Sequence, residues 1–310
     1  WSGRSSSGSG SAVGAGLVPF ALGSETWGSI MTPAGYCGVT GLRPTYGRVS
    51  RHGAMALSWT MDKLGCLTRT ADDAGVVLNA IAGHDPADAT SVRRQFAYKV
   101  RQPKRRIQLA RLEGDVEHVQ AAVRENFARS LAVLAQEADI TTISLPPLPY
   151  NVVAGVLIDC EMAAAFEGLV TSGDVWEMTA PEDRIGAHAG QMIPAKDYIN
   201  ALRIRRRIQV ELDKALAPFD ALVTPTLSSV AGPIDRDFAS YHRRFRGTEI
   251  GGAGNAAGIP AITVPNGTGE KGLPTGLKFV GRAFSENRLL NLASKYQEQT
   301  QWHLDKPAGW

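Results

Sequence analysis

Two clusters of serine and glycine near the start of the chain constrain its fold more than any other feature. The first cluster covers Gly3–Ser11 and the second covers Ser24–Pro33, and a short apolar stretch joins them. Serine and glycine runs are usually linkers, because ordering them costs more free energy than their burial returns. Here the apolar residues of Ala12–Leu22 favour an ordered segment, namely a buried helix start followed by a short core strand.

The glycines of both clusters suit catalysis as well as turn formation. Glycine at this density lets several backbone N–H groups point toward one position. Such donors stabilise the oxyanion that forms when a nucleophile attacks a carbonyl, and each contributes roughly 2.7–4 kcal/mol in the transition state. The residues alone leave two interpretations open, a catalytic loop and a glycine-rich structural turn.

The two clusters resemble the signature of the amidase signature family. That signature runs Gly-Gly-Ser-Ser-x-Gly-Ser, then an acidic residue, then Thr-x-Gly-Ser-Ile-Arg-x-Pro. The resemblance implies amide hydrolysis by a Ser–cis-Ser–Lys triad, in which Ser29 attacks the carbonyl and forms an acyl-enzyme. It also implies that Ser5 adjoins a cis peptide bond and relays the proton between Ser29 and the lysine. The oxyanion hole would consist of the backbone N–H groups of Thr26, Trp27, Gly28 and Ser29.

The lysine of the triad lies upstream of the first cluster in the family, and this chain has no lysine before Ser5. A serine hydroxyl needs a base, and a lysine serves only when burial has lowered its pKa from about 10.4 toward 7. The nearest downstream lysine, Lys63, is interpreted as structural or surface-exposed. We therefore expect one amidase signature domain over residues 1–310 that lacks its N-terminal segment and is inactive by itself.

Three residues depart from the family signature. Arg4 replaces the second glycine of the first cluster, and this limits backbone freedom there. Trp27 replaces a frequent glycine beside the nucleophile, so its ring would enter or cover the site. Met31 replaces the arginine that usually follows Ser-Ile, which removes one positive charge near the site. Each departure is expected to alter substrate preference without abolishing the chemistry.

The resemblance extends over residues 1–100 and 196–305, and it is weaker between about 100 and 194, a region expected to shape the substrate pocket. Periodicity and cap signals predict helices over 69–82, 119–134, 198–216 and around 289–296. Strands are predicted over 107–112 and 140–145 and from residue 222. This alternation indicates an α/β fold, and the family implies a mixed, largely parallel β-sheet sandwiched by helices.

Charge and cysteine content narrow the function further. The net charge is +3, and the arginine-rich runs at 101–106, 203–207 and 243–246 contain no regular aromatic interleaving, so they are interpreted as solvated helix faces and loop anchors rather than a nucleic-acid site. The three cysteines suit free thiols in a reducing compartment. No histidine motif typical of a metal site occurs, so neither a metal nor a cofactor is expected. Glu161 and His188 are interpreted as packing residues.

Three functions stay open. The first is a stand-alone amidase acting on a small-molecule amide, which Trp27 and Met31 favour. The second is the A subunit of a glutamyl-tRNA(Gln)/aspartyl-tRNA(Asn) amidotransferase, which hydrolyses glutamine and passes ammonia to a partner protein; only there would nucleic acid be a partner. The third is an inactive relative with a binding role. No membrane partner is expected, a homodimer stays open, and the cytoplasm is the expected location, although a signal peptide cannot be judged in a chain that begins at Trp1.

Overall fold

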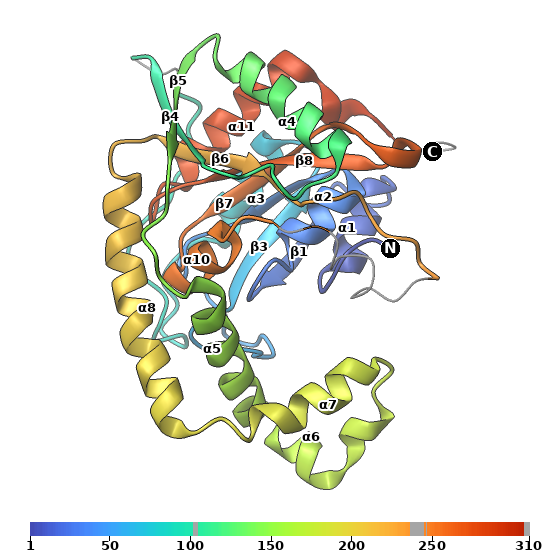
Figure 1. Ribbon diagram of the computed structural model, residues 1–310, viewed down its shortest axis with the longest axis vertical. Coiled ribbons are helices and arrows are strands. Elements are labelled where there is room, and N and C mark those ends of the chain that lie inside the picture. Colours follow the sequence, from blue (N-terminus) through green and yellow to red (C-terminus); the bar gives the residue numbers. More distant parts are fainter. Residues whose placement is uncertain (102–104, 236–244, 246, 307–310) are drawn as a thin grey trace.

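An eight-stranded mixed sheet forms the centre of the computed structural model, which describes residues 1–101, 105–235, 245 and 247–306 (Figure 1). The strands are arranged in the order β1-β3-β2-β7-β8-β6-β4-β5. Their bounds are β1 (Phe20–Glu25), β2 (Thr40–Arg43), β3 (Lys63–Thr68), β4 (Ile107–Leu112), β5 (Ala138–Ile143), β6 (Ala221–Pro225), β7 (Ala261–Thr268) and β8 (Pro274–Val280).

The sheet is mixed and flanked by helices, as expected, but most of its strand pairs are antiparallel rather than parallel. Among the described residues only the β4–β5 and β4–β6 pairs run parallel. Parallel neighbours need a long crossover, usually a helix, whereas antiparallel neighbours need only a short turn. The strands β7 and β8 are joined by such a turn at Glu270–Gly272, and they pair antiparallel. The parallel pairing that the helix–strand alternation predicts is therefore found only at the β6-β4-β5 end of the described sheet.

Ten α-helices are described, and they include the four that the sequence predicts. The predicted helices are confirmed as α3, α4, α8 and α11, and the strand predicted over 107–112 is confirmed as β4. The strand predicted over 140–145 begins two residues earlier, at Ala138. The helices are α1 (Ser7–Gly14), α2 (Met31–Cys37), α3 (Ala71–Ile81), α4 (Ala121–Leu134), α5 (Tyr150–Ala165), α6 (Glu167–Ser172), α7 (Pro181–Gly190), α8 (Ala195–Leu216), α10 (Ile250–Ala257) and α11 (Glu286–Thr300), with short 3₁₀ turns at Asp174–Glu177, Glu270–Gly272 and Trp302–Leu304.

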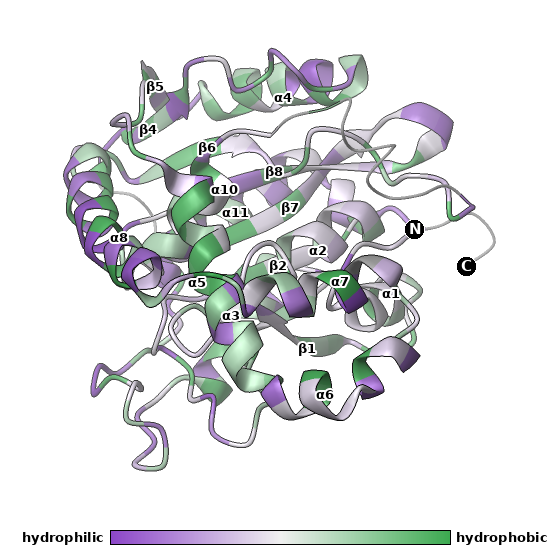
Figure 2. Ribbon diagram, turned by 60° about the horizontal axis from the view of Figure 1, so that its bottom comes forward, coloured by the Kyte–Doolittle hydropathy of each residue, from purple (hydrophilic) through white to green (hydrophobic). Residues whose placement is uncertain are grey.

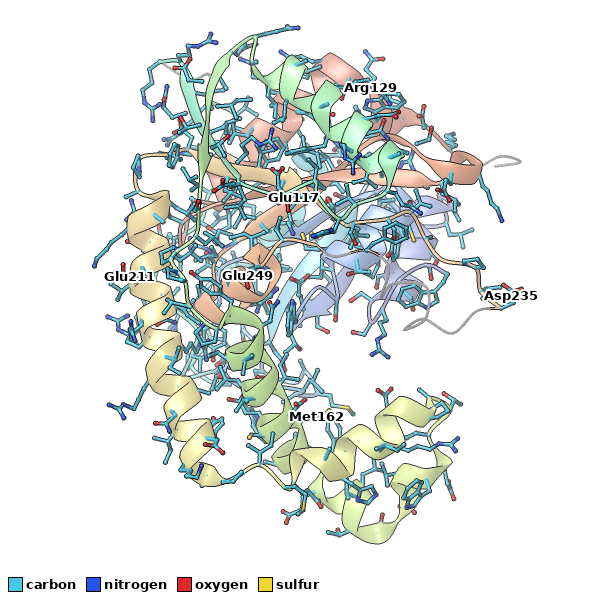
Figure 3. The ribbon with its side chains drawn as sticks, viewed as in Figure 1. Glu117, Arg129, Met162, Glu211, Asp235 and Glu249 are labelled. Carbon is cyan, nitrogen blue, oxygen red and sulfur yellow. The ribbon has the colours of Figure 1, made fainter. Side chains whose placement is uncertain are left out.

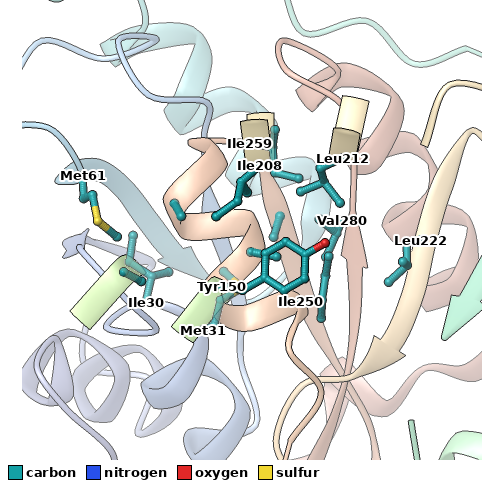
Figure 4. Packing of buried hydrophobic residues seen from close by; sticks show 14 of the residues in the cluster. Ile30, Met31, Met61, Tyr150, Ile208, Leu212, Leu222, Ile250, Ile259 and Val280 are labelled. Carbon is teal, nitrogen blue, oxygen red and sulfur yellow. The ribbon is translucent and has the colours of Figure 1, made fainter. Parts of the chain in front are cut away.

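Two hydrophobic clusters pack the helices against the sheet. One gathers α2, α5, α8 and α10, and Figure 4 shows Tyr150, Ile208, Leu212 and Ile250 meeting within it. The other gathers α3, α4 and α11 with the inner residues of β2, β6, β7 and β8. Figure 2 shows hydrophilic and hydrophobic residues alternating around α8, which buries only one side. Each large side chain buried in these clusters contributes about 1.5–3 kcal/mol to folding.

The first strand corrects one expectation. A short core strand was expected before the second serine cluster, whereas β1 lies at an edge of the sheet and, among the described strands, pairs only with β3. Phe20 is 47% exposed and Leu22 is 51% exposed, while Glu25 at the end of the strand is fully buried. The strand is therefore exposed or half-buried along the rest of its length, and its last residue places a buried carboxylate within the second serine cluster.

The arginine run on α8 is only partly a solvated face. Arg203, Arg206 and Arg207 are exposed, but Arg205 is buried and donates hydrogen bonds to the carbonyl oxygens of Ala256, at 2.7 Å, and Thr60. In the run at 101–106, the described Arg105 and Arg106 form surface ion pairs with Asp220 and Asp139. Of the run at 243–246, all three arginines lie outside the described residues.

The segment from α6 to α7 extends away from the sheet beyond the end of α5, where Met162 is labelled in Figure 3. It has a small hydrophobic cluster of its own, formed by Val170, Val175 and Ala187. His188 of α7 stacks on Trp176 with a ring separation of 5.2 Å, in agreement with its interpretation as a packing residue. None of the helices described is long and apolar enough to cross a membrane.

The predicted start signal of α3 is confirmed, and it gives a testable stability effect. The Thr70 hydroxyl accepts a hydrogen bond from the backbone N–H of Asp73 at 3.0 Å. Thr70→Ala should destabilise the protein by about 1 kcal/mol, because it removes an N-cap. Urea denaturation would measure this loss. Thr70→Ser keeps the hydroxyl and should lose much less, so an equal loss in both variants would contradict the cap as the cause.

Candidate active site

The second serine cluster forms the connection between β1 and α2. Residues 26–30 turn the chain from the end of the strand into the helix, and Ser29 lies half-buried in this turn. Gly28 has a φ of 89°, in the left-handed region that side chains other than glycine rarely adopt. Its carbonyl accepts a hydrogen bond of 2.7 Å from the N–H of Thr32, which closes the turn. The turn therefore presents Ser29 at a fixed position ahead of α2.

The first serine cluster lies directly against this turn. The N–H of Ser6 donates to the Ser29 carbonyl at 3.2 Å, and the Ser6 hydroxyl bonds to the backbone of Ser24. The peptide bond between Arg4 and Ser5 is cis, as the resemblance implies. Within the described part of the chain, no hydrogen bond joins the hydroxyls of Ser5 and Ser29. The structure thus brings the two clusters together through their backbones.

The Glu25 side chain forms hydrogen bonds to the start of α2. One of its carboxylate oxygens accepts hydrogen bonds from the N–H groups of Ile30 and Met31 at 2.9 and 3.0 Å. The other accepts from the Arg43 guanidinium at 2.8 Å. Arg43 in turn donates from two nitrogens to the carbonyl of Ile259, just before β7. These bonds fix the turn to the middle of the sheet.

The charge on Glu25 is stable despite its burial. Burial raises the pKa of this carboxyl, but the positive charges of Arg43 and Lys63 and the Met31 N–H outweigh burial and lower the pKa to about 2. Arg43 and Glu25 are both almost completely buried. A buried ion pair of this kind tolerates the removal of neither partner.

Thr26 and Lys63 support the other side of the turn. The Thr26 hydroxyl donates to the Asp62 carboxylate at 2.5 Å, and Asp62 also accepts the N–H groups of Leu57 and Ser58. Lys63 is buried, so it is structural and not a surface residue. Its ammonium donates to the carbonyls of Thr26, at 3.4 Å, and Met61. Burial, followed by the charge of Arg43, lowers the pKa of Lys63 well below its usual value.

The turn leaves its own N–H groups available. Across the described residues, none of the N–H groups of Trp27, Gly28 and Ser29 donates a hydrogen bond. Consecutive free N–H groups beside a serine hydroxyl are the donors that an oxyanion requires. The arrangement can therefore stabilise a negatively charged oxygen next to Ser29.

A cavity of about 240 Å³ adjoins the turn. Trp27 and Gly28 line one side of it, and the Trp27 side chain is 39% exposed. Lys278 from β8 and Asn255 from α10 line other parts, whereas Ser5 and Ser29 are not among the lining residues. Burial and the charge of Arg43 lower the pKa of Lys278 to about 8, although Glu25 acts in the opposite direction.

Sequence reasoning missed Glu25, Arg43 and Lys278 as site residues. Glu25 could have been found, because it is the only charged residue between Arg4 and Arg43. Lys278 offers a similar signal, since it interrupts the apolar strand around Leu277 and Phe279. Arg43 has no local signal, because the residues that it joins lie in distant parts of the chain.

The remaining expectations concern packing and metals. Glu161 is buried and accepts hydrogen bonds from Ser58, Thr60 and Tyr198, so it is a packing residue as predicted. The three cysteines are free thiols. In the part of the chain that the structure describes, no group of three His, Cys, Asp or Glu side chains could hold a metal ion.

Comparisons with known proteins agree with this architecture. Residues 1–290 match the family model described as Amidase. The chain is 31% identical over 333 residues to the A subunit of glutamyl-tRNA(Gln) amidotransferase from Legionella pneumophila, covering 98% of this chain and 69% of that protein. It resembles the crystal structure of the corresponding Thermotoga maritima protein, with a TM-score of 0.76, 30% identity and coverage of 94% of this chain and 64% of that one.

The chain also resembles a solved structure that is named as an amidase rather than as an amidotransferase subunit. The peptide amidase of Stenotrophomonas maltophilia matches with a TM-score of 0.78 and 32% identity, covering 95% of this chain and 65% of that one. The chain spans about two thirds of the length of these relatives. The match to the family model covers most of the chain, so the protein belongs to the amidase family.

Proposed function

We propose that the protein hydrolyses a carbon–nitrogen amide bond through an acyl-enzyme, with Ser29 as the nucleophile. The observation that carries the proposal is the contact between the two clusters, in which the Ser6 N–H donates to the Ser29 carbonyl beside a turn fixed by Glu25. This contact places Ser5 and Ser29 in one neighbourhood although 24 positions separate them in sequence. Membership of the amidase family supports the same chemistry.

The proposed reaction has two stages. The Ser29 oxygen attacks the amide carbonyl while its proton passes through the Ser5 hydroxyl to a base, and the N–H groups of residues 26–29 stabilise the oxyanion. The C–N bond then breaks, and the amine leaves with the relayed proton. A water molecule then attacks the resulting ester and gives one of its protons to the base; the acid is released, and that proton passes to the Ser29 oxygen.

The base in this proposal is the lysine of the family triad, which lies upstream of the first serine cluster in the family. Lys63 does not serve, because its ammonium donates to the carbonyls of Thr26 and Met61. In the described part of the chain Lys63 makes no hydrogen bond to Ser5 or Ser29. No cofactor takes part in the proposed steps.

A small-molecule amide is the proposed substrate. Trp27 is well exposed and lines the cavity beside the turn, so its ring would contact a bound amide. Met31 also lines this cavity and presents an apolar surface where the family signature has an arginine. From the middle of the chain, Asp115 and Val119 are the described residues that line this cavity.

Covalent labelling gives a direct test of the nucleophile. A serine-directed fluorophosphonate should modify the intact protein at one site, and peptide mass spectrometry should assign the label to Ser29. The reason is that the reagent needs both an activated hydroxyl and oxyanion donors. A label on another serine would remove Ser29 from the mechanism. Failure to label at all, with the protein folded, would favour a non-catalytic binding role.

The relatives' names support a second candidate. The Legionella protein and the Thermotoga structure are both named as the A subunit of glutamyl-tRNA(Gln) amidotransferase. In that role this protein would hydrolyse glutamine and pass ammonia to a partner. Glutaminase activity that rises when tRNA and partner proteins are added would favour this candidate. Equal activity with and without them would favour the stand-alone amidase.

A further inference from the structure

Buried polar atoms without partners gather around the cavity beside the turn. The Thr224 hydroxyl, the Asn255 side-chain oxygen and one Asp115 carboxylate oxygen are buried, and each lacks a hydrogen-bond partner in the described parts of the chain. Lys278 is 8% exposed, and its ammonium makes no hydrogen bond or ion pair with any described residue. Leaving such groups unpaired costs about 1–3 kcal/mol each, and more for a charge. Their concentration at one cavity indicates that they bind something that enters it.

The charges around the cavity leave one cation in excess. Glu25 is paired with Arg43 at 2.8 Å. Asp115 is paired with Arg111 at 2.5 Å, and burial raises the pKa of Asp115 against the effect of that arginine. Within the described residues that line the cavity, Lys278 is therefore the charged group without a counter-ion. An anion is the natural partner for it.

The position of Lys278 in the sheet places this cation in the cavity that adjoins the turn of the proposed reaction centre. Lys278 on β8 lies between Thr224 on β6 and Thr263 on β7 in the antiparallel register. Lys278 and Thr224 line the same cavity as Trp27 and Gly28, which belong to the proposed oxyanion hole. A ligand in the cavity can thus reach both the cation and the turn.

We infer that this cavity is a carboxylate-binding subsite, in which Lys278 and the Thr224 hydroxyl hold the carboxylate of an acidic amide substrate. The inference rests on the proposed amidase function and names its substrate class. A carboxylate accepts hydrogen bonds from an ammonium and a hydroxyl at once, and charge-assisted bonds of this kind are the strong ones. The Asn255 oxygen accepts an N–H from the same substrate, so an amide that also carries a carboxylate satisfies three of the unpaired groups.

The subsite should depend on pH in one direction. The pKa of Lys278 is lowered to about 8, so its positive charge is present at pH 7 and is lost as the pH rises through that value. The charged groups that face it are Glu25 and Arg43, with Asp115 across the cavity. Glu25, whose pKa is about 2, stays charged throughout this range. Binding of a carboxylate should therefore weaken above pH 8, while binding of a neutral amide should not change.

Two amides of equal length test the subsite. Succinamate carries a carboxylate where butyramide carries a methyl group, and their dissociation constants can be measured by calorimetry on the Ser29→Ala protein, which does not consume them. At pH 7 succinamate should bind about 10- to 100-fold more tightly than butyramide, the worth of a charge-assisted hydrogen bond. Lys278→Met should abolish this preference, and Lys278→Arg should retain most of it. Equal binding of the two amides, or a preference that survives Lys278→Met, would overturn the inference.

Two further measurements make the result decisive. If Lys278→Met does not fold, the preference measured in the Ser29→Ala protein at about pH 7 and about pH 9.5 gives the same test, and it should disappear at the higher pH. Turnover by the intact protein separates this inference from the proposed function. Preferential binding of succinamate without hydrolysis of either amide would support the subsite and remove the amidase proposal. Hydrolysis of butyramide with no preference for succinamate would support the amidase proposal and remove the carboxylate subsite.

Discussion

Replacing Ser29 with alanine should lower the turnover of an amide substrate by roughly 10⁶ in the intact protein, as for other serine nucleophiles. The physical reason is that the other hydroxyl of the turn between β1 and α2, on Thr26, already donates to Asp62 and cannot replace it. Without the Ser29 hydroxyl no acyl-enzyme forms, and only the oxyanion donors and substrate binding remain. Steady-state kinetics with a chromogenic amide would measure the loss.

A matched control is available in the same cluster. Ser24 is exposed on β1, and the hydrogen bonds that it makes to Ser6 involve its backbone. Ser24→Ala should therefore retain nearly full turnover, and both variants should keep the melting temperature of the parent. Turnover in Ser29→Ala within about tenfold of the parent would exclude Ser29 as the nucleophile.

Replacing Glu25 with alanine should cost about 3–5 kcal/mol of unfolding free energy, because it leaves the buried Arg43 without its counter-ion. The same change frees the N–H groups of Ile30 and Met31, so turnover should fall as well. Chemical denaturation would give the stability loss. Asp213→Ala provides the comparison, since it removes an ion pair with Arg282 whose side chains are 51% and 44% exposed. That surface pair should contribute less than about 1 kcal/mol.

The Glu25 pair also predicts how stability depends on acid. Its carboxyl has a pKa of about 2 in the folded protein against 4.5 ordinarily, so the pair stabilises the protein fully above pH 4.5. The difference between these two pKa values corresponds to about 3 kcal/mol of unfolding free energy. This contribution should be lost progressively as the pH falls from 4.5 toward 2. Denaturation at about pH 6, 4 and 3 would reveal the loss. Glu25→Gln should lack this portion of the acid dependence, and an unchanged acid profile in that variant would contradict the assignment.

Local patterns predicted the elements that local interactions determine. The cap of α3 at Thr70, the bounds of β4 and the end of α8 at Leu216 all match the structure. Each of these depends on residues a few positions apart, such as a hydroxyl and an N–H three residues on. The serine clusters were informative for the same reason: the conformation of a turn depends on the few consecutive residues that form it.

Long-range contacts account for what the sequence did not reveal. The antiparallel pairing of β2 with β7 joins segments that are far apart in the chain, and no local pattern encodes it. Arg205 lies in a run of arginines, yet it alone turns inward to the carbonyls of Ala256 and Thr60. Its burial depends on where α8 crosses α10, which is a property of the assembled fold. The cavity around Lys278 is likewise built from β6, β8, α10 and the turn together.

The link from Glu25 through Arg43 to Ile259 also has a consequence for synthesis on the ribosome. Arg43 and Ile259 are 216 residues apart, and a nascent chain extends at about 5–20 residues per second. The serine clusters therefore leave the ribosome roughly 10 to 40 seconds before the strand that anchors their turn exists. During that interval β2 has an unpaired edge, which is the kind of surface on which partly made chains associate. A pause or truncation before β7 should thus yield chains that need a chaperone, while chains released after β8 should not.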